Sequence, residues 1–125
     1  MAFTSWRGVL GLIKPTRRPG SLEELVRMLP EGIGIIPTLL DVRTGSKKEF
    51  TEAVRQYEPK VRELAEQEVD VIHPGGSAPF MLLGYDGERE LARKWEKKYG
   101  VPLFTPGQNH ARAMKAFGIK RAVNI

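Results

Sequence analysis

The residues best suited to chemistry follow a short apolar segment in the middle of the chain. Residues 69–72 read Val-Asp-Val-Ile and are followed directly by His-Pro-Gly-Gly-Ser at 73–77. Glycines let a ligand approach the backbone closely, and successive N–H groups beside a hydroxyl can hold an anion. The pattern predicts a binding site for a carboxylate or an enolate at Gly75, Gly76 and Ser77. A turn that only reverses the chain is the alternative.

Other polar side chains follow apolar segments in the same way. His73 offers a general acid or base, although a hydrogen-bonded structural histidine is the commoner role. Thr16 offers a hydroxyl, and Arg17 or Arg18 could bind a carboxylate through the guanidinium fork. Simple surface charge is the alternative for the arginines. Thr105 could donate to a carboxylate or cap the helix that follows it.

The composition narrows the possible chemistry. The sequence contains no cysteine, so it offers no disulfide, thiolate metal site or cysteine nucleophile, and its two histidines do not make a metal site. The glycine spacing matches neither dinucleotide-binding nor phosphate-loop patterns. We therefore expect no metal and no cofactor. No Ser-His-Asp set can be assembled, and the catalytic residues stay unassigned.

Short apolar segments alternate with amphipathic ones along the chain. This alternation predicts a doubly wound, mainly parallel α/β sheet of about five strands with helices on both faces. The strands are expected at 7–13, 33–40, 69–72 and 101–104, with a fifth beginning at 121–125. The helices are expected from 21 to 29, from 46 to 58, from about 60 to 68, from 86 or 87 to 99, and from 110 to 117.

Local signals refine these elements. Ser21–Glu24 and Ser46–Glu49 both have the spacing of a helix capping box. Pro37 places the second strand at an edge or ends it there, and Pro59 is expected to kink or restart a helix. The loops at 14–20, 73–80 and 105–109 each follow a strand, so they should lie at the same edge of the sheet.

Charge and hydropathy bear on the kind of ligand the chain could bind and on its location in the cell. The formal net charge of +5 is compatible with an acidic ligand. Basic residues at 89–98 are interspersed with glutamates, which is typical of a solvated helix face and argues against nucleic-acid binding. No apolar run is long enough for a membrane span and no secretory signal is present, so we expect a cytoplasmic protein without a membrane partner.

The chain resembles the amino-terminal half of the aspartate/glutamate racemase superfamily, in its maleate isomerase and arylmalonate decarboxylase branch. The similar segments occur in the family's order across nearly the whole chain. They are Gly-Val-Leu-Gly-Leu-Ile-Lys-Pro at 8–15, Met-Leu-Pro-Glu-Gly at 28–32, 64–77, Tyr-Gly-Val-Pro-Leu-Phe-Thr at 99–105 and 113–121. The resemblance implies that 1–125 is one α/β domain whose facing second domain is absent from this chain.

The resemblance also implies a reaction. Family members are cofactor-independent isomerases, racemases or decarboxylases of small carboxylic or dicarboxylic acids, and racemases place one cysteine in each domain. The first cysteine position falls at Gly75, and the decarboxylases likewise have glycine there. This chain alone is therefore expected to be inactive in thiol chemistry. Its first loop, Pro-Thr-Arg-Arg-Pro at 15–19, departs from the family's Ser and Asn.

Two further expectations concern partners. A half-domain exposes apolar surface where its counterpart would pack, which predicts a homo-oligomer. The alternative to an enzyme half is a non-catalytic, flavodoxin-like module that uses the same loop to bind an anion or a partner.

Overall fold

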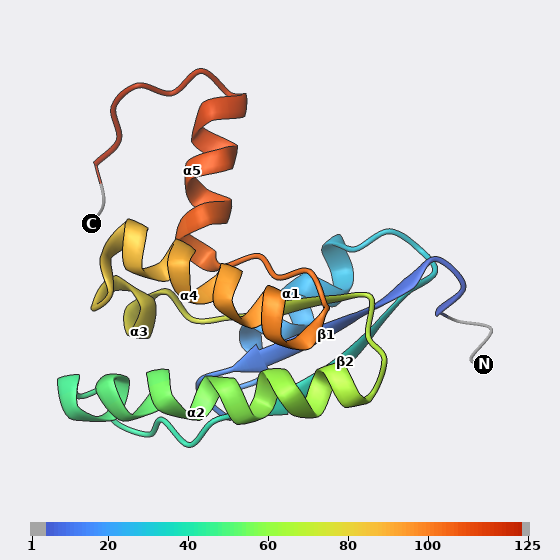
Figure 1. Cartoon of the computed structure of the whole chain (residues 1–125). Helices are drawn as coiled ribbons and strands as arrows, with labels where there is room; N and C mark the ends of the chain where they lie inside the picture. The colour runs from blue at the N-terminus through green and yellow to red at the C-terminus, as the bar shows by residue number, and fades with distance from the viewer. Residues whose placement is uncertain (1–4, 124–125) are drawn as a thin grey trace.

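The computed structural model describes residues 5–123 and shows strands and helices in alternation over most of that length (Figure 1). The strands are β1 (Gly8–Lys14), β2 (Ile33–Leu39) and β3 (Val71–Pro74). The helices are α1 (Gly20–Met28), α2 (Lys47–Glu66), α3 (Ser77–Met81), α4 (Gly84–Tyr99) and α5 (Pro106–Ala116). None of these helices is long and apolar enough to cross a membrane.

The three strands form one parallel sheet in the order β2-β1-β3. Leu12 of the central strand lies opposite Pro37 of β2 and His73 of β3. Because the strands are parallel, their carboxyl ends meet at one edge of the sheet. The edge position predicted for the strand that contains Pro37 is confirmed, and this proline is exposed.

The expected sheet of about five strands is wrong, because the described residues contain three. The segment around Leu103 forms only an isolated parallel bridge with Ile72. Pro102 has no N–H to extend the ladder, and helix α5 begins soon afterwards at Pro106. Residues 121–123 are not in a strand, and the rest of the expected fifth strand, 124–125, lies outside the described residues.

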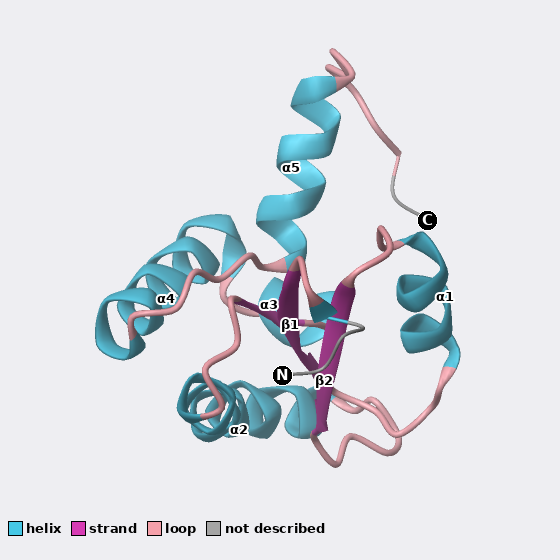
Figure 2. Cartoon of the chain, turned by 90° about the vertical axis from the view of Figure 1, so that its right-hand side faces the viewer, coloured by secondary structure: helices cyan, strands magenta, loops and turns pink. Residues whose placement is uncertain are grey.

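Helices cover both sides of the sheet, as expected. Figure 2 shows α1 on one side and α2 and α4 on the other. The side under α2 holds the main core, in which Ile13 and Ile72 are fully buried. The helix residues buried in this core are Ala53, Tyr57, Val61 and Leu64 of α2 and Trp95 of α4. Helix α1 contributes no buried residue, and α5 projects away from the sheet (Figure 1).

Of the two predicted capping boxes, one is confirmed and the other is wrong. Ser46 accepts a hydrogen bond from the amide of Glu49 at 3.2 Å, and the reciprocal bond completes the predicted capping box. Ser21 caps nothing: α1 already begins at Gly20, with Pro19 in the N-cap position. The chain therefore enters this helix two residues earlier than the spacing of polar residues indicated.

Other boundaries also differ. Helix α2 runs through Pro59 as one element, so the helix does not restart there. The carbonyl that loses its donor belongs to Arg55, which is exposed. Strand β3 lies two residues later than predicted, because its pairing with β1 covers 71–74. The short helix α3 was not expected. Helix α5 begins at Pro106 rather than at His110, with the proline in the first turn.

Candidate functional site

The loops that follow the strands meet at the carboxyl edge of the sheet. After β2, the amide of Leu40 donates to the carbonyl of Lys14 at 2.8 Å. The amide of Val42 then donates to the carbonyl of Pro15 at 3.0 Å. These bonds fix the loops after β1 and β2 against each other, and the glycine loop after β3 lies beside them.

The glycine loop has a defined geometry. The amide of Gly75 donates to Ile13 at 2.8 Å, so the expectation that this N–H binds an anion is not supported by its bonding. The amides of Gly76 and Ser77 have no protein acceptor among residues 5–123. Gly76 has a φ of 95°, and a Cβ there would lie 2.6 Å from Cγ of Pro15. Only glycine fits this position without rearrangement.

Tyr57, a buried residue of α2 that lies outside the predicted site, supports this loop. The hydroxyl of Tyr57 in α2 donates to the carbonyl of Gly75 at 2.5 Å, and its ring packs against Phe80 with centroids 4.9 Å apart. Burial raises the pKa of Tyr57, so the hydroxyl remains a donor. The only sequence signal for this role is that a buried tyrosine needs a polar partner.

His73 is held rigidly at the end of β3. Its Nδ1 lies 2.8 Å from the carbonyl oxygen of Phe104, and the two rings stack with centroids 4.4 Å apart. A carbonyl only accepts, so Nδ1 carries the proton and Nε2 is a free acceptor. Burial lowers the pKa of His73 despite this hydrogen bond, which favours the neutral ring. Nε2 lies 3.7 Å from the position that a Cβ on Gly75 would occupy.

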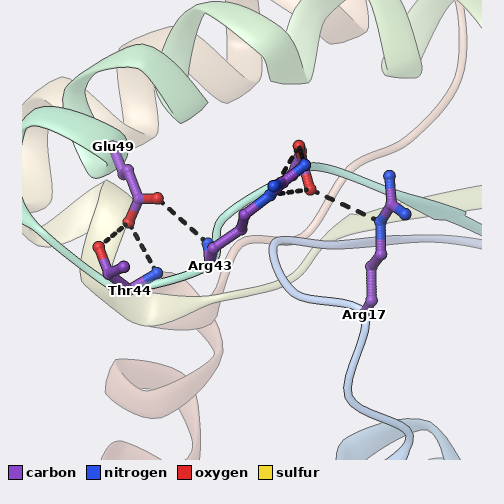
Figure 3. A network of polar contacts seen from close by, with 5 residues as sticks. Arg17, Arg43, Thr44 and Glu49 are labelled. Carbon is purple, nitrogen blue, oxygen red and sulfur yellow. Dashed lines mark hydrogen bonds and ion pairs between the residues drawn. The ribbon is translucent and has the colours of Figure 1, made fainter.

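Thr16 and Arg17 lie at the same edge but open onto a different cavity from Ser77. They line a surface cavity of about 440 Å³ between the loops after β1 and β2. Arg17 Nε lies 3.6 Å from a carboxylate oxygen of Asp41, which also pairs with Arg43 at 2.8 Å (Figure 3). The hydrogen bond from Arg43 lowers the pKa of Asp41 and keeps it charged. Arg17 is therefore partly committed to this exposed ion pair.

Ser77 lines a separate cavity of about 550 Å³ beneath α5. His110 and the buried side chain of Glu88 line it as well, and the rest of the lining is largely apolar. The loop from Gly75 to Ser77 thus lies between two cavities, with the arginines on one side and this apolar space on the other.

Thr105 is not available to a ligand at the surface. It occupies the N-cap position of α5 but makes no capping hydrogen bond, and its fully buried hydroxyl has no partner among the described residues. Glu88 serves the helix instead by accepting from the amide of Gly107 at 2.8 Å. Thr105 adjoins the site through Phe104, whose carbonyl holds His73.

A second group of backbone amides that could bind an anion follows β2, but the carboxylate of Glu49 already occupies it. The carboxylate of Glu49 accepts from the amide of Thr44 at 3.0 Å and from its hydroxyl at 2.7 Å (Figure 3). It also accepts from the amide of Gly45 at 2.7 Å. These bonds, with the hydroxyl bond as the largest cause, lower the pKa of Glu49 to about 2. Residues 43–46 are therefore closed to an external anion.

Metal ligands do not gather at the edge. Across residues 5–123, no three His, Asp or Glu side chains lie together in a way that could hold a metal ion. The features that remain available to a ligand are backbone amides, hydroxyls, one imidazole nitrogen and basic side chains. These groups are suited to binding a carboxylate.

The parallel sheet, with its candidate loops at the carboxyl edge, defines an α/β domain. The particular likeness is to the crystal structure of the maleate isomerase Iso from Pseudomonas putida S16, with a TM-score of 0.74 and 18% sequence identity. The alignment covers 89% of this chain and 50% of that chain, so this chain spans half of its length. The sequence matches no known family profile and no curated protein.

Proposed function

We propose that this chain is the amino-terminal half of a cofactor-independent isomerase, racemase or decarboxylase that acts on a small carboxylic or dicarboxylic acid. The observation that carries the proposal is the likeness of fold to a maleate isomerase over 89% of the chain. The loop after β3 supports carboxylate binding, because the amides of Gly76 and Ser77 and the Ser77 hydroxyl are available at the edge where α/β domains bind ligands.

The space around the two glycines supports Gly75 as the first cysteine position of the family. A Cβ on Gly75 would lie 3.0 Å from the carbonyl oxygen of Ile13, which is tight but needs only a small shift. A Cβ on Gly76 would overlap Pro15 and require a side chain at a positive φ. Of the two positions, 75 is the one that can carry a thiol in a relative. This chain supplies no thiol of its own.

His73 is the group beside this position that can accept a proton. Its ring is fixed by Phe104, and Nε2 is unprotonated on the side of Gly75. In the proposed reaction, the imidazole would hold the acidic proton of the ligand or orient a water. Thr16 and Arg17 would contribute to the rim, and Thr105 would act only by supporting the segment that holds His73.

The experiment is a titration of the isotopically labelled chain with malonate and with maleate, followed by NMR. The amides of Gly76 and Ser77 should shift in a saturable way, and Ser77→Ala should weaken binding. Ser21→Ala is the matched control, because this exposed serine makes no capping bond in α1. Binding that leaves both loop amides unmoved, or no binding at all, would contradict the proposed site.

The second candidate is a non-catalytic module that binds an anion or a second copy of itself. The exposed apolar residues at the junction of α3 and α4 favour it. They are Met81, Leu82, Leu83 and Tyr85, with 69%, 44%, 36% and 51% of their surfaces exposed. We propose that two copies associate through this segment, named here the 81–85 patch. The same surface would serve an enzyme half that docks against its counterpart.

A further inference from the structure

Lys14, the last residue of β1, is buried with only 3% of its surface exposed. A buried ammonium is costly unless an opposite charge compensates it. Lys14 forms no salt bridge with a carboxylate of residues 5–123; its Nζ donates to the carbonyl oxygen of Arg18. A carbonyl satisfies one of three ammonium protons and carries no net charge. The structure therefore contains a buried cation without an anion.

The sheet register places this cation next to the glycine loop. Leu12 pairs with His73, and Ile13 pairs with Pro74. Continuing the register by one residue places Lys14 beside Gly75, and the bond from the Gly75 amide to Ile13 extends the ladder in that direction. Paired residues of parallel strands point to the same face, and alternate residues of one strand share it. Lys14, His73 and position 75 thus belong to one face of the sheet.

We infer that Lys14 is the cationic partner of a carboxylate of the bound ligand. This inference rests on the proposed function. One carboxylate is held by the free amides of Gly76 and Ser77, and the other reaches the ammonium of Lys14. Binding replaces the Arg18 carbonyl with a charged acceptor, which gives a stronger hydrogen bond than a neutral one. The sequence offered no signal for this role, because Lys14 follows an apolar strand like an ordinary loop residue.

A purely structural role for Lys14 makes the opposite predictions. If its function is to fasten the 15–19 loop through Arg18, removing the ammonium should lower the melting temperature and leave the affinity of the folded protein for dicarboxylates unchanged. If the ammonium instead binds a ligand, replacing it with an apolar side chain removes a buried charge that is uncompensated in the ligand-free protein. Stability should then stay the same or rise, while binding is lost.

The test compares the native chain with Lys14→Met and with Lys48→Met, whose lysine lies exposed on α2. Calorimetric titration with malonate should show affinity reduced about tenfold or more for Lys14→Met, the usual range for losing a charged hydrogen bond. Lys48→Met should bind like the native chain. Without ligand, Lys14→Met should melt no lower than the native protein. Unchanged affinity, or a melting temperature below that of the native protein, overturns the assignment.

A second measurement observes the ammonium directly. The ¹⁵N signal of the Lys14 side chain should shift on addition of malonate, and that of Lys48 should not. Acetate, with one carboxylate, should bind more weakly than malonate and should lose less affinity in Lys14→Met. Equal sensitivity of acetate and malonate to this substitution overturns the assignment of Lys14 to the second carboxylate. If the native chain binds neither acid, the proposed function itself fails; if it binds malonate and Lys14→Met does too, only the role of Lys14 fails.

Discussion

The hydroxyl of Tyr57 donates a 2.5 Å hydrogen bond to the carbonyl oxygen of Gly75, which ties the middle of α2 to the glycine loop. The bond is buried, and the raised pKa of Tyr57 keeps its donor protonated. The carbonyl of Gly75 thus faces the core and its amide is bonded to Ile13, while the next two amides have no acceptor within residues 5–123. The loop is held from inside the protein and is open on its outer side.

Replacing this tyrosine should loosen the site. Tyr57→Phe leaves the Gly75 carbonyl without its buried partner and should lower the free energy of unfolding by about 1–3 kcal/mol. Urea unfolding would measure this loss. Tyr85→Phe is the matched control, because Tyr85 is half exposed and its hydroxyl has no hydrogen-bond partner within residues 5–123. An equal effect of the two substitutions would show that the bond contributes nothing to stability.

A side chain at Gly76 should be poorly tolerated. Gly76→Ala combines a positive φ with a Cβ 2.6 Å from Pro15, and we expect a loss of about 3 kcal/mol or more in the free energy of unfolding. Gly84→Ala separates the two causes: Gly84 has a φ of 67° but open space around it, so its loss should be about 1–2 kcal/mol. Thermal and urea unfolding would rank the variants. A smaller loss for Gly76→Ala than for Gly84→Ala would contradict the predicted overlap with Pro15.

The local parts of the fold were predictable from the sequence. The capping box at Ser46–Glu49 needs only residues three apart, and the edge position of Pro37 follows from its missing N–H. The alternation of strands and helices likewise led to a parallel sheet with its candidate loops at one edge. The first two features depend on contacts within a few residues or on a single backbone property, and the parallel sheet follows from the order of the elements along the chain.

Long-range pairing could not be read from the same patterns. Strand β3 is placed by its register with β1, and the segment after α4 reaches Ile72 for a single bridge only. The bond that fixes His73 comes from Phe104, and the bond that fixes the glycine loop comes from Tyr57. Neither spacing nor composition encodes these partners. The compensating charge that Lys14 lacks is visible only once its burial is known.

The stability of the protein should depend on pH through Glu49. The pKa of Glu49 in the folded protein is about 2, below its ordinary value of 4.5, so its contribution to stability is fully present above pH 4.5 and is lost as the pH falls toward 2. Glu49→Gln should therefore melt lower than the native chain at neutral pH, and the difference should shrink in acid. Glu52→Gln, on the exposed side of the same helix, is the control. A difference that does not change with pH would exclude the charge as the cause.

Finally, the 81–85 patch should mediate self-association. Its apolar side chains lie together at the junction of α3 and α4, where Leu82 and Leu83 also border a surface cavity against α2. Sedimentation velocity of the native chain should show a dimer that forms with increasing concentration, and Leu82→Glu should shift it to monomer because a charge would be buried at the contact. Met28→Glu, on an 80% exposed residue of α1, should leave the dimer intact. A native chain that stays monomeric at every concentration, or a dimer that survives Leu82→Glu, would rule out this surface.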